Sequence, residues 1–463
     1  MKVEQIYTGC LAQGAYYIES DGEAAIIDPL RETDPYVTKA KKDGAEIKYI
    51  FETHFHADFV SGHLDLSKKT GGTIVYGQGA NPSFDFVEAK DGMEFKLGKV
   101  VLRALHTPGH TLESTTYLLI DEEGVEKAIF SGDTLFIGDV GRPDLAQKGA
   151  MTQDDLAGML FDSLRSKIMT LPDDIVVYPA HGAGSACGKN MSSETTDTLG
   201  NQKETNYALR ANMTREEFIR EVTDGILPPP KYFASNVQMN KAGAVSLDDV
   251  MAKGNVPLDL ETFEAMANHE GALVLDTRNE SEFVKAHVPN SIFIGIDGSF
   301  APWVGALIPD LQQPIVFIAD TGREEEVVKR LSRVGFDNTL GYLNGGFESW
   351  IRAGKETDSV ESMNATEFET AFENEDLNVL DVRKPGEWSI DHVEGAENVP
   401  LDFISDQMNK LDKAKTYHVH CLGGYRSVIA ISILKSRGYH NLVDIAEGYK
   451  AITKTSIPRT VAV

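Results

Sequence analysis

Short runs of apolar residues that end near a histidine or an aspartate recur along the N-terminal part of the chain. Apolar and β-branched runs bounded by turn residues predict buried strands. Four such runs, each written with the polar segment that follows it, are 47–51 before E-T-H-F-H-A-D, 100–105 before H-T-P-G-H, 128–130 before S-G-D and 175–178 before P-A-H-G. Because ligands collect where the strands of α/β sheets end, the pattern predicts a functional site assembled from strand ends.

The densest polar segment places His54, His56 and Asp58 at alternate positions. Alternate side chains of an extended segment share one face, and in a loop all three could converge on one ion. Histidine and carboxylate ligands suit zinc or ferrous iron. Paired histidines also occur on ordinary surfaces, so this segment alone leaves a surface loop as the alternative. Four motifs in order, all at predicted strand ends, favour a metal site.

The second half of the chain contains an internal repeat. After Leu227, three prolines and then small and polar residues predict a boundary near Gly254. Beyond it, L-D-T-R at 275–278 returns as L-D-V-R at 380–383, each followed by an acidic–aromatic pair and later by H-V. Strands alternating with helices predict parallel sheets covered on both faces. The chain is too long for one core, and we predict domains at 1–254, 255–357 and 358–463.

The second copy of the repeat contains a cysteine loop. Residues 417–420 predict a strand, 428–435 predict a helix, and the segment C-L-G-G-Y-R-S joins them. Backbone N–H groups of a loop at a helix N-terminus form a cradle for an anion. Cys421, with Arg426 nearby, is therefore a candidate nucleophile beside an anion site. A buried structural cysteine is the alternative.

Composition limits the partners and the compartment. The 463 residues include 44 basic and 71 acidic ones, a formal net charge of −27, which argues against nucleic acid or an anionic membrane surface as the main partner. There is no apolar run long enough for a transmembrane helix and no apolar signal segment at the start. Three cysteines cannot form a disulfide framework, so we expect a cytoplasmic protein.

The N-terminal motifs resemble those of the metallo-β-lactamase fold, an αββα sandwich, and within it they look most like the persulfide dioxygenases. The resemblance covers roughly residues 1 to 245. Its motifs are I-D-P at 27–29, T-H-x-H-A-D at 53–58, T-P-G-H-T at 107–111, S-G-D-T-L-F at 131–136, G-R-P-D at 141–144 and Y-P-A-H at 178–181.

This resemblance implies one Fe(II) per chain, held by His54, His110 and Asp133, with positions left open for substrate and O₂. Zinc is the alternative metal in recombinant material. In two-metal hydrolases of the superfamily a histidine follows the motif aspartate, and here that position is Phe59. The resemblance therefore favours a single metal.

Four further residues near the implied metal have less definite roles. The resemblance makes His56, Asp58 and His181 groups that orient the ligands or the substrate, with His56 also an additional ligand candidate. Arg142 either anchors the active-site loop or meets an anionic substrate.

The D-x-R and C-x-x-G-x-R-S patterns resemble the rhodanese domain, a sulfurtransferase. The resemblance implies that Cys421 accepts sulfur and that Arg426 and the loop hold the anionic donor. The implied substrate-binding loop residues are Gly423, Gly424, Tyr425 and Ser427. A cysteine phosphatase is the alternative, but its loop is one residue longer.

The first copy of the repeat departs from the rhodanese pattern. Asp320 replaces the cysteine and Glu325 replaces the arginine. A carboxylate cannot accept sulfur as a persulfide, and added negative charge repels an anionic donor. This copy is expected to be an inactive spacer or docking surface.

Together the resemblances imply a persulfide dioxygenase–rhodanese fusion that detoxifies sulfide. Its expected partners are a small thiol persulfide, O₂, and sulfite or thiosulfate, in a homodimer or homotetramer. The alternatives are a zinc-dependent thioester hydrolase of glyoxalase II type, a non-catalytic sulfur carrier, and a rhodanese whose front domain only oligomerises.

Overall fold

The computed structural model describes residues 1–146 and 151–461. The chain forms two compact units, the first comprising Met1–Leu247 with the short segment Ser332–Gly335, and the second Asp248–Leu331 with Phe336–Val463. In the described part of the chain, no helix is both long enough and apolar enough to cross a membrane.

The first unit contains two six-stranded sheets. The strands of the first sheet, in spatial order, are β1 Lys2–Thr8, β2 Gln13–Ser20, β3 Glu23–Ile27, β4 Glu46–Phe51, β5 Thr73–Gly77 and β6 Val87–Ala89. Those of the second are β12 Asp197–Thr198, β11 Val176–Pro179, β10 Glu126–Gly132, β9 Thr115–Ile120, β8 Val100–His106 and β7 Glu94–Leu97. Its helices are α1 Asp34–Asp43, α2 His63–Thr70, α3 Gln153–Ser163, α4 Leu199–Thr205, α5 Arg215–Thr223 and α6 Phe233–Ala242.

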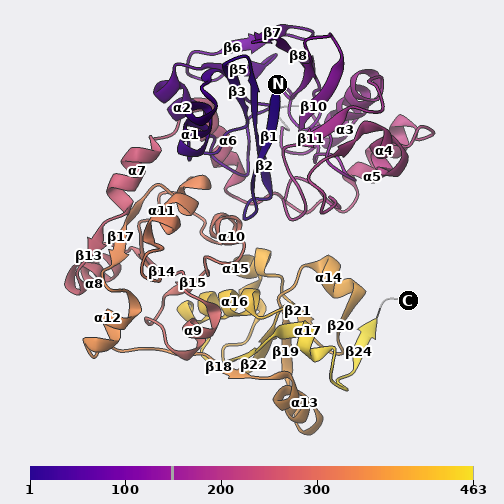
Figure 1. Cartoon of the computed structure of the whole chain (residues 1–463). Coiled ribbons are helices and arrows are strands. Elements are labelled where there is room, and N and C mark those ends of the chain that lie inside the picture. Colours follow the sequence, from indigo (N-terminus) through magenta and orange to yellow (C-terminus); the bar gives the residue numbers. More distant parts are fainter. Residues whose placement is uncertain (147–150, 462–463) are drawn as a thin grey trace. The chain divides into compact units, whose positions relative to one another are not determined.

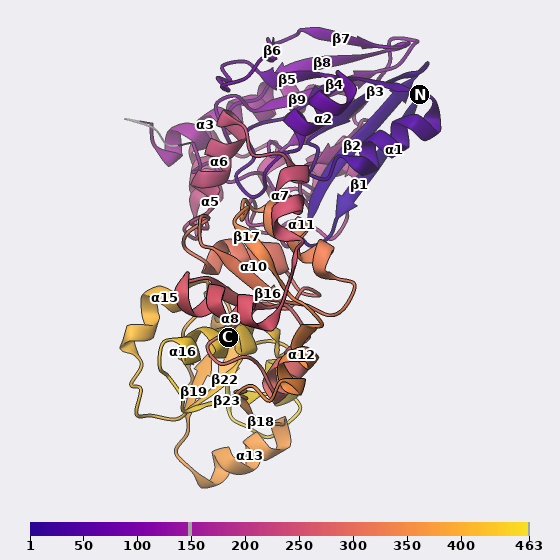
Figure 2. The ribbon, with the colours of Figure 1, turned by 90° about the vertical axis from the view of Figure 1, so that its left-hand side faces the viewer.

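The two sheets pack face to face with helices outside them. Phe51 of the first sheet and Phe130 of the second lie in one buried cluster between the sheets. Tyr36 of α1 is buried against the outer face of the first sheet, and Phe218 of α5 against that of the second. Burial of each such ring contributes roughly 2 kcal/mol. Figure 1 shows α1 and α2 on one side of the strands and α3 to α5 on the other, and Figure 2 shows α1 and α2 toward the viewer. The expected αββα sandwich is confirmed.

The predicted strand ends coincide with observed ones. The apolar runs 47–51 and 128–130 lie in β4 and β10, which end at Phe51 and Gly132. Gly132 has φ +54°, and a Cβ there would stand 2.6 Å from the Thr53 side chain. Only glycine allows these two strand ends to approach so closely.

The second unit contains two parallel five-stranded sheets, one for each copy of the repeat. The first comprises β13 Pro257–Leu258, β17 Thr339–Leu343, β16 Ile315–Ile318, β14 Leu273–Asp276 and β15 Ile292–Phe293. The second comprises β18 Glu361–Met363, β23 Leu442–Ile445, β22 Tyr417–His420, β19 Asn378–Asp381 and β21 Glu397–Asn398. A small antiparallel pair joins β20 Asp391–Val393 to β24 Arg459–Val461.

Helices accompany both parallel sheets, as the alternating pattern predicts. Those of the first copy are α8 Leu260–His269, α9 Glu280–Lys285, α10 Phe300–Leu307, α11 Glu324–Arg333 and α12 Gly346–Arg352, and α7 Leu247–Gly254 precedes them. Those of the second are α13 Ala365–Asn374, α14 Pro385–Ile390, α15 Ile404–Gln407, α16 Tyr425–Ser436 and α17 Gly448–Ile452. The domain limits predicted from the sequence stay predictions.

Candidate metal centre and cysteine loop

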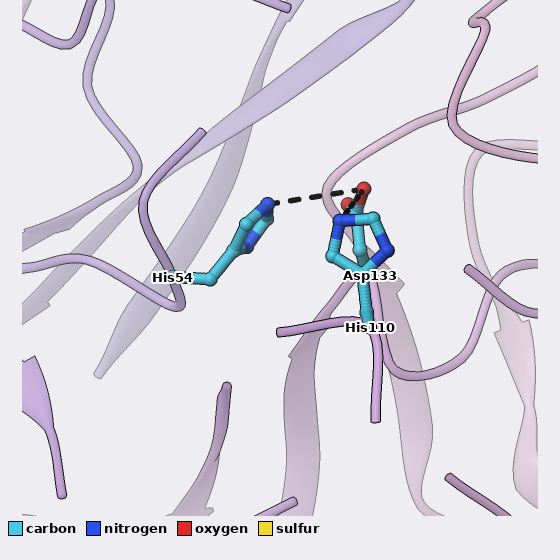
Figure 3. Close-up of side chains that lie close together, drawn as sticks. All are labelled: His54, His110 and Asp133. Atoms are coloured by element: carbon cyan, nitrogen blue, oxygen red, sulfur yellow. Dashed lines mark ion pairs between the residues drawn. The ribbon is translucent and has the colours of Figure 1, made fainter. Parts of the chain in front are cut away.

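Three strand ends bring His54, His110 and Asp133 together (Figure 3). His54 follows β4, His110 follows β8 and Asp133 follows β10. The Asp133 Oδ2 atom lies 3.3 Å from His110 Nε2 and 3.9 Å from His54 Nε2. All three side chains are buried. His54 Nε2 and both Asp133 oxygens lack a hydrogen-bond partner among the described residues. Buried polar atoms left without partners are costly, so this donor set fits a metal ion.

Hydrogen bonds behind the two rings fix which nitrogen faces the centre. His110 Nδ1 lies 2.8 Å from the carbonyl oxygen of Arg142, so it donates and leaves a lone pair on Nε2. Thr53 donates its hydroxyl proton to Asp28 Oδ2 at 2.8 Å and therefore accepts from His54 Nδ1 at 3.0 Å. Burial and three neighbouring histidines hold the pKa of His54 well below its usual value. Both rings can thus turn Nε2 toward a metal.

A second polar cluster adjoins the first. His56, Asp58 and His181 offer atoms within 4.8 Å of one another. His181 Nε2 lies 3.4 Å from Asp58 Oδ2 and 3.6 Å from Asp133 Oδ1. His181 and Asp58 therefore stand beside the metal trio, where they can orient a substrate or hold a proton.

His56 also lies beside two further carboxylates. Its Nε2 lies 3.0 Å from Asp28 Oδ1 and 3.5 Å from Glu52 Oε2. Burial opposes protonation, but Asp28, Glu52 and Asp58 raise the pKa of His56 to about 9. The ring of Phe59 stacks on His56 with centroids 4.2 Å apart. In two-metal hydrolases of the superfamily a histidine ligand follows the motif aspartate. Here the apolar ring of Phe59 occupies that position after Asp58.

Arg142 is held by partners within its own unit. It makes a bidentate pair with Asp144, at 2.6 and 2.7 Å, and donates to the carbonyl oxygens of Ala186 and Leu227. Its own carbonyl oxygen accepts the hydrogen bond from His110 Nδ1. These contacts are those of a loop anchor, and they satisfy most of its donors, so they leave little of the guanidinium for an anionic substrate.

Cys187 is buried beside the second cluster. Its Sγ lies within 4.8 Å of ligand atoms of Asp133 and His181. Burial, with the charges of Asp58 and Asp133, raises the pKa of this thiol well above its usual value. A thiol in such surroundings stays protonated and unreactive.

In the second unit, Cys421 lies between β22 and the N-terminus of α16, as predicted. It is buried, and the Gly424 N–H donates to its Sγ at 3.1 Å. Gly424 has φ +103°, a conformation that favours glycine. The neighbouring Leu422 and Gly423 are exposed, so this side of the loop faces solvent.

The other predicted loop residues use their side chains elsewhere. Arg426 pairs with Glu387 through two hydrogen bonds of 2.7 and 2.8 Å. Ser427 Oγ hydrogen-bonds to Gly424 O and to Asp444 Oδ1, both at 2.8 Å. Sequence reasoning missed Glu387 and Asp444, although Glu387 belongs to the acidic–aromatic pair of the repeat.

The first copy shares the repeat's framework but not its cysteine. Asp276 and Asp381 each hold the arginine two residues later, with the shortest contact 2.6 Å in both. Glu325 pairs with Lys329 on α11. The carboxylate that replaces the loop arginine is therefore engaged on its own helix.

Comparisons with known proteins agree with this architecture. Residues 8–181 match the Metallo-beta-lactamase superfamily, and residues 259–353 and 364–455 match the Rhodanese-like domain. A metallo-beta-lactamase structure from Staphylococcus aureus subsp. aureus COL is 31% identical, with a TM-score of 0.65, and the match covers 74% of this chain and 98% of that one.

The curated relatives include a dioxygenase and a hydrolase. The mitochondrial persulfide dioxygenase of Homo sapiens is 31% identical over 220 residues, which is 47% of this chain and 78% of the relative. A probable hydroxyacylglutathione hydrolase of Schizosaccharomyces pombe is 36% identical over 160 residues, which is 34% of this chain and 58% of the relative.

Fold, donor set and matches define a metallo-β-lactamase domain followed by two rhodanese-like domains. The chain belongs to the metallo-β-lactamase superfamily, in the arrangement of a persulfide dioxygenase–rhodanese fusion. The family predicted from the sequence is confirmed.

Proposed function

We propose that this chain is an Fe(II) persulfide dioxygenase that also transfers sulfane sulfur through Cys421. The observation that carries the proposal is the buried trio of two imidazoles and one carboxylate, with Phe59 beside it in place of a further ligand. One ion per chain held by such a set keeps positions open, which suits oxygenase chemistry. Recombinant material can instead carry zinc.

One persulfide anion, one O₂ and one water would give one thiol, one sulfite and one proton. Fe(II) held by His54, His110 and Asp133 supplies the redox chemistry that lets O₂ react with the terminal sulfur. His181 and Asp58 lie within reach of that position and can orient the persulfide and hold the released proton. Burial of the whole group excludes bulk water.

At the second site, the Cys421 thiolate would attack the outer sulfur of thiosulfate. The S–S bond of thiosulfate breaks, a new S–S bond forms on Cys421, and sulfite leaves. A small thiol, such as glutathione or coenzyme A, then takes the sulfur as a persulfide and frees Cys421. The reverse direction joins sulfite and persulfide into thiosulfate. We further propose a cytoplasmic homodimer or homotetramer that detoxifies persulfide.

The test measures oxygen uptake and sulfite formation by protein of known metal content, with glutathione persulfide and coenzyme A persulfide as substrates. His110→Ala should abolish iron-dependent uptake, and Cys421→Ser should retain it but lose sulfur transfer. His106→Ala is the matched control, because it removes a half-buried histidine that the metal cluster does not include. An iron-loaded parent that takes up no oxygen with either persulfide would refute the dioxygenase.

A thioester hydrolase is the second candidate, and the adjoining cluster of His56, Asp58 and His181 favours it. Two metals per chain together with cleavage of a glutathione thioester would support the hydrolase. Full metal occupancy with neither activity would support a sulfur carrier instead. If the two units act separately, loss of iron leaves sulfur transfer intact. That result supports a rhodanese whose front domain only oligomerises only if the iron-loaded parent also takes up no oxygen.

A further inference from the structure

Within the second unit, helix α16 of the cysteine-bearing copy packs against β15, the edge strand of the first copy. Two side chains of α16 meet main-chain groups at this edge. Ser432 Oγ accepts from Phe293 N–H at 3.0 Å, and Tyr425 Oη donates to Gly295 O at 2.6 Å. Edge strands present unpaired backbone groups, and these two contacts satisfy one donor and one acceptor there.

The first copy provides a fitted seat for the Tyr425 ring. A Cβ added at Gly298 would stand 2.3 Å from Tyr425 Cζ, and one at Gly295 would stand 3.1 Å from its Cε2. Phe293 meets the same ring edge to face, with centroids 5.9 Å apart and an interplanar angle of 71°. The ring therefore occupies space that two glycines leave open.

The environment of the hydroxyl also comes from the first copy. Burial raises the pKa of Tyr425, Glu280 and Asp297 raise it further, and Arg330 opposes them. The hydroxyl consequently remains a proton donor at neutral pH, as its bond to the Gly295 carbonyl requires.

Tyr425 is next in the chain to the residue that hydrogen-bonds to Cys421. It is the first residue of α16 and follows Gly424, whose N–H donates to Cys421 Sγ. Tyr425 and Gly424 share a peptide bond, so a seat that holds the Tyr425 ring limits how far the Gly424 backbone, with its φ of +103°, can move. Small displacements of such groups change rates strongly.

We propose that the first rhodanese copy, which has no cysteine of its own, positions the Cys421 loop of the second copy through Tyr425. Tyr425 is thus a positioning residue, and its seat is formed by Phe293, Gly295 and Gly298. The inference assigns a role to the degenerate copy beyond a spacer, and it rests on the proposed sulfur transfer at Cys421.

The test compares Tyr425→Phe, which keeps the ring, with Gly298→Ala, which displaces it. One readout is the rate at which iodoacetamide alkylates Cys421, resolved by mass spectrometry, and the other is kcat and KM for sulfur transfer from thiosulfate. Gly298→Ala should lower both the alkylation rate and kcat about tenfold, with a smaller change in KM. Tyr425→Phe should lower them about threefold, as expected for one lost hydrogen bond.

Tyr439→Phe is the matched control, because Tyr439 also donates to a backbone carbonyl, that of Met408, but away from the loop. In a Tyr425→Ala background, Gly298→Ala should add nothing, since the colliding ring is gone. Parent-like alkylation and kcat in both single variants would overturn the positioning role. If the parent forms no persulfide at Cys421, the proposed sulfur transfer is wrong, and the alkylation rates alone test whether the first copy positions the loop. If Gly298→Ala fails to fold, the alkylation rate and kcat of Tyr425→Phe decide the question.

Discussion

Arg426 and Glu387 form a closed pair, in which Nη1 and Nη2 of the arginine each donate to one carboxylate oxygen, at 2.7 and 2.8 Å. The two residues come from α16 and α14, so the pair fixes the loop against the preceding half of the repeat. It also neutralises the positive charge that the sequence assigns to anion binding. The anionic donor must then rely on the loop amides and the helix N-terminus.

Glu387→Gln should strengthen binding of anionic donors. The substitution keeps an oxygen acceptor for Arg426 but removes one negative charge near the loop. The Arg426 charge that is then left uncompensated is expected to lower KM for thiosulfate roughly threefold to fivefold, with kcat less affected. Steady-state kinetics at two ionic strengths would measure the effect, which should shrink at higher salt because salt screens it.

Glu394→Gln provides the control for this substitution, because it removes an exposed carboxylate of the same repeat. It should leave KM for thiosulfate at the parent value. A rise in KM for Glu387→Gln would mean that the pair holds Arg426 in its working position, which would contradict the charge argument.

Thr53→Val should weaken metal binding without removing a ligand. Thr53 accepts from His54 Nδ1 and is itself held by Asp28 through its backbone N–H and its hydroxyl. Valine keeps the shape but loses the acceptor that orients the His54 ring. Loss of such a partner typically lowers metal affinity roughly 10- to 100-fold. Competition with a chelator, followed by metal analysis, would measure the change.

Thr73→Val, at an exposed position of β5, is the control for that experiment. Its iron affinity should equal that of the parent. Equal affinity in Thr53→Val would show that packing alone orients His54.

The fold and the strand ends that carry the candidate ligands could be predicted because their signals are local, whereas the resemblance to the persulfide dioxygenases selected the metal trio among them. The run 47–51 and the motif after it lie within one strand and one turn, and they occur where β4 ends. The same holds for Cys421, which the sequence places between a strand and a helix. The proposed roles of these residues stay predictions until the activities are measured.

Contacts between residues far apart in the sequence could not be predicted in this way. Asp28 holds Thr53 across 25 positions, and Tyr425 reaches Gly295 across 130. Such pairs depend on how whole elements pack, and no sequence motif around one residue identifies the other. For this reason the rhodanese resemblance implies a substrate-binding role for Tyr425 but gives no sign that its hydroxyl hydrogen-bonds to Gly295 in the first copy.

Asp444 makes stability depend on pH. Burial raises its pKa to about 6, although hydrogen bonds from Ser427 and Ser362 oppose the rise. A carboxyl with a raised pKa in the folded state binds its proton more tightly there, so its contribution is most favourable below about pH 4 and is lost as pH rises through 6. The loss is on the order of 3 kcal/mol.

Asp444→Asn should remove this penalty while keeping an oxygen for Ser427. The variant should gain melting temperature relative to the parent at pH 7.5, and the gain should shrink at pH 4.5, as measured by calorimetry. Asp376→Asn, at an exposed position of the same repeat, controls for the loss of one carboxylate. A gain that is equal at both pH values would contradict the titration of Asp444.

Phe59→His should convert the first unit toward a two-metal site. Phe59 is buried and its ring stacks on His56, so an imidazole there would lie next to Asp58 and near His181. These residues would then offer a second ion a fuller set of ligands, beside the ion expected at the trio. Metal analysis should show the ratio rising from about one toward two per chain. Thioester hydrolysis should appear while persulfide-dependent oxygen uptake falls.

Phe55→His is the control for this conversion, because Phe55 lies in the same loop but stacks on Tyr76 rather than on His56. It should leave the metal ratio unchanged. If the parent already binds two ions, or if Phe59→His still binds one, then Phe59 does not decide the metal count. The preference for one ion would in that case have to come from the carboxylates that engage His56, since Asp28 and Glu52 lie 3.0 and 3.5 Å from its Nε2.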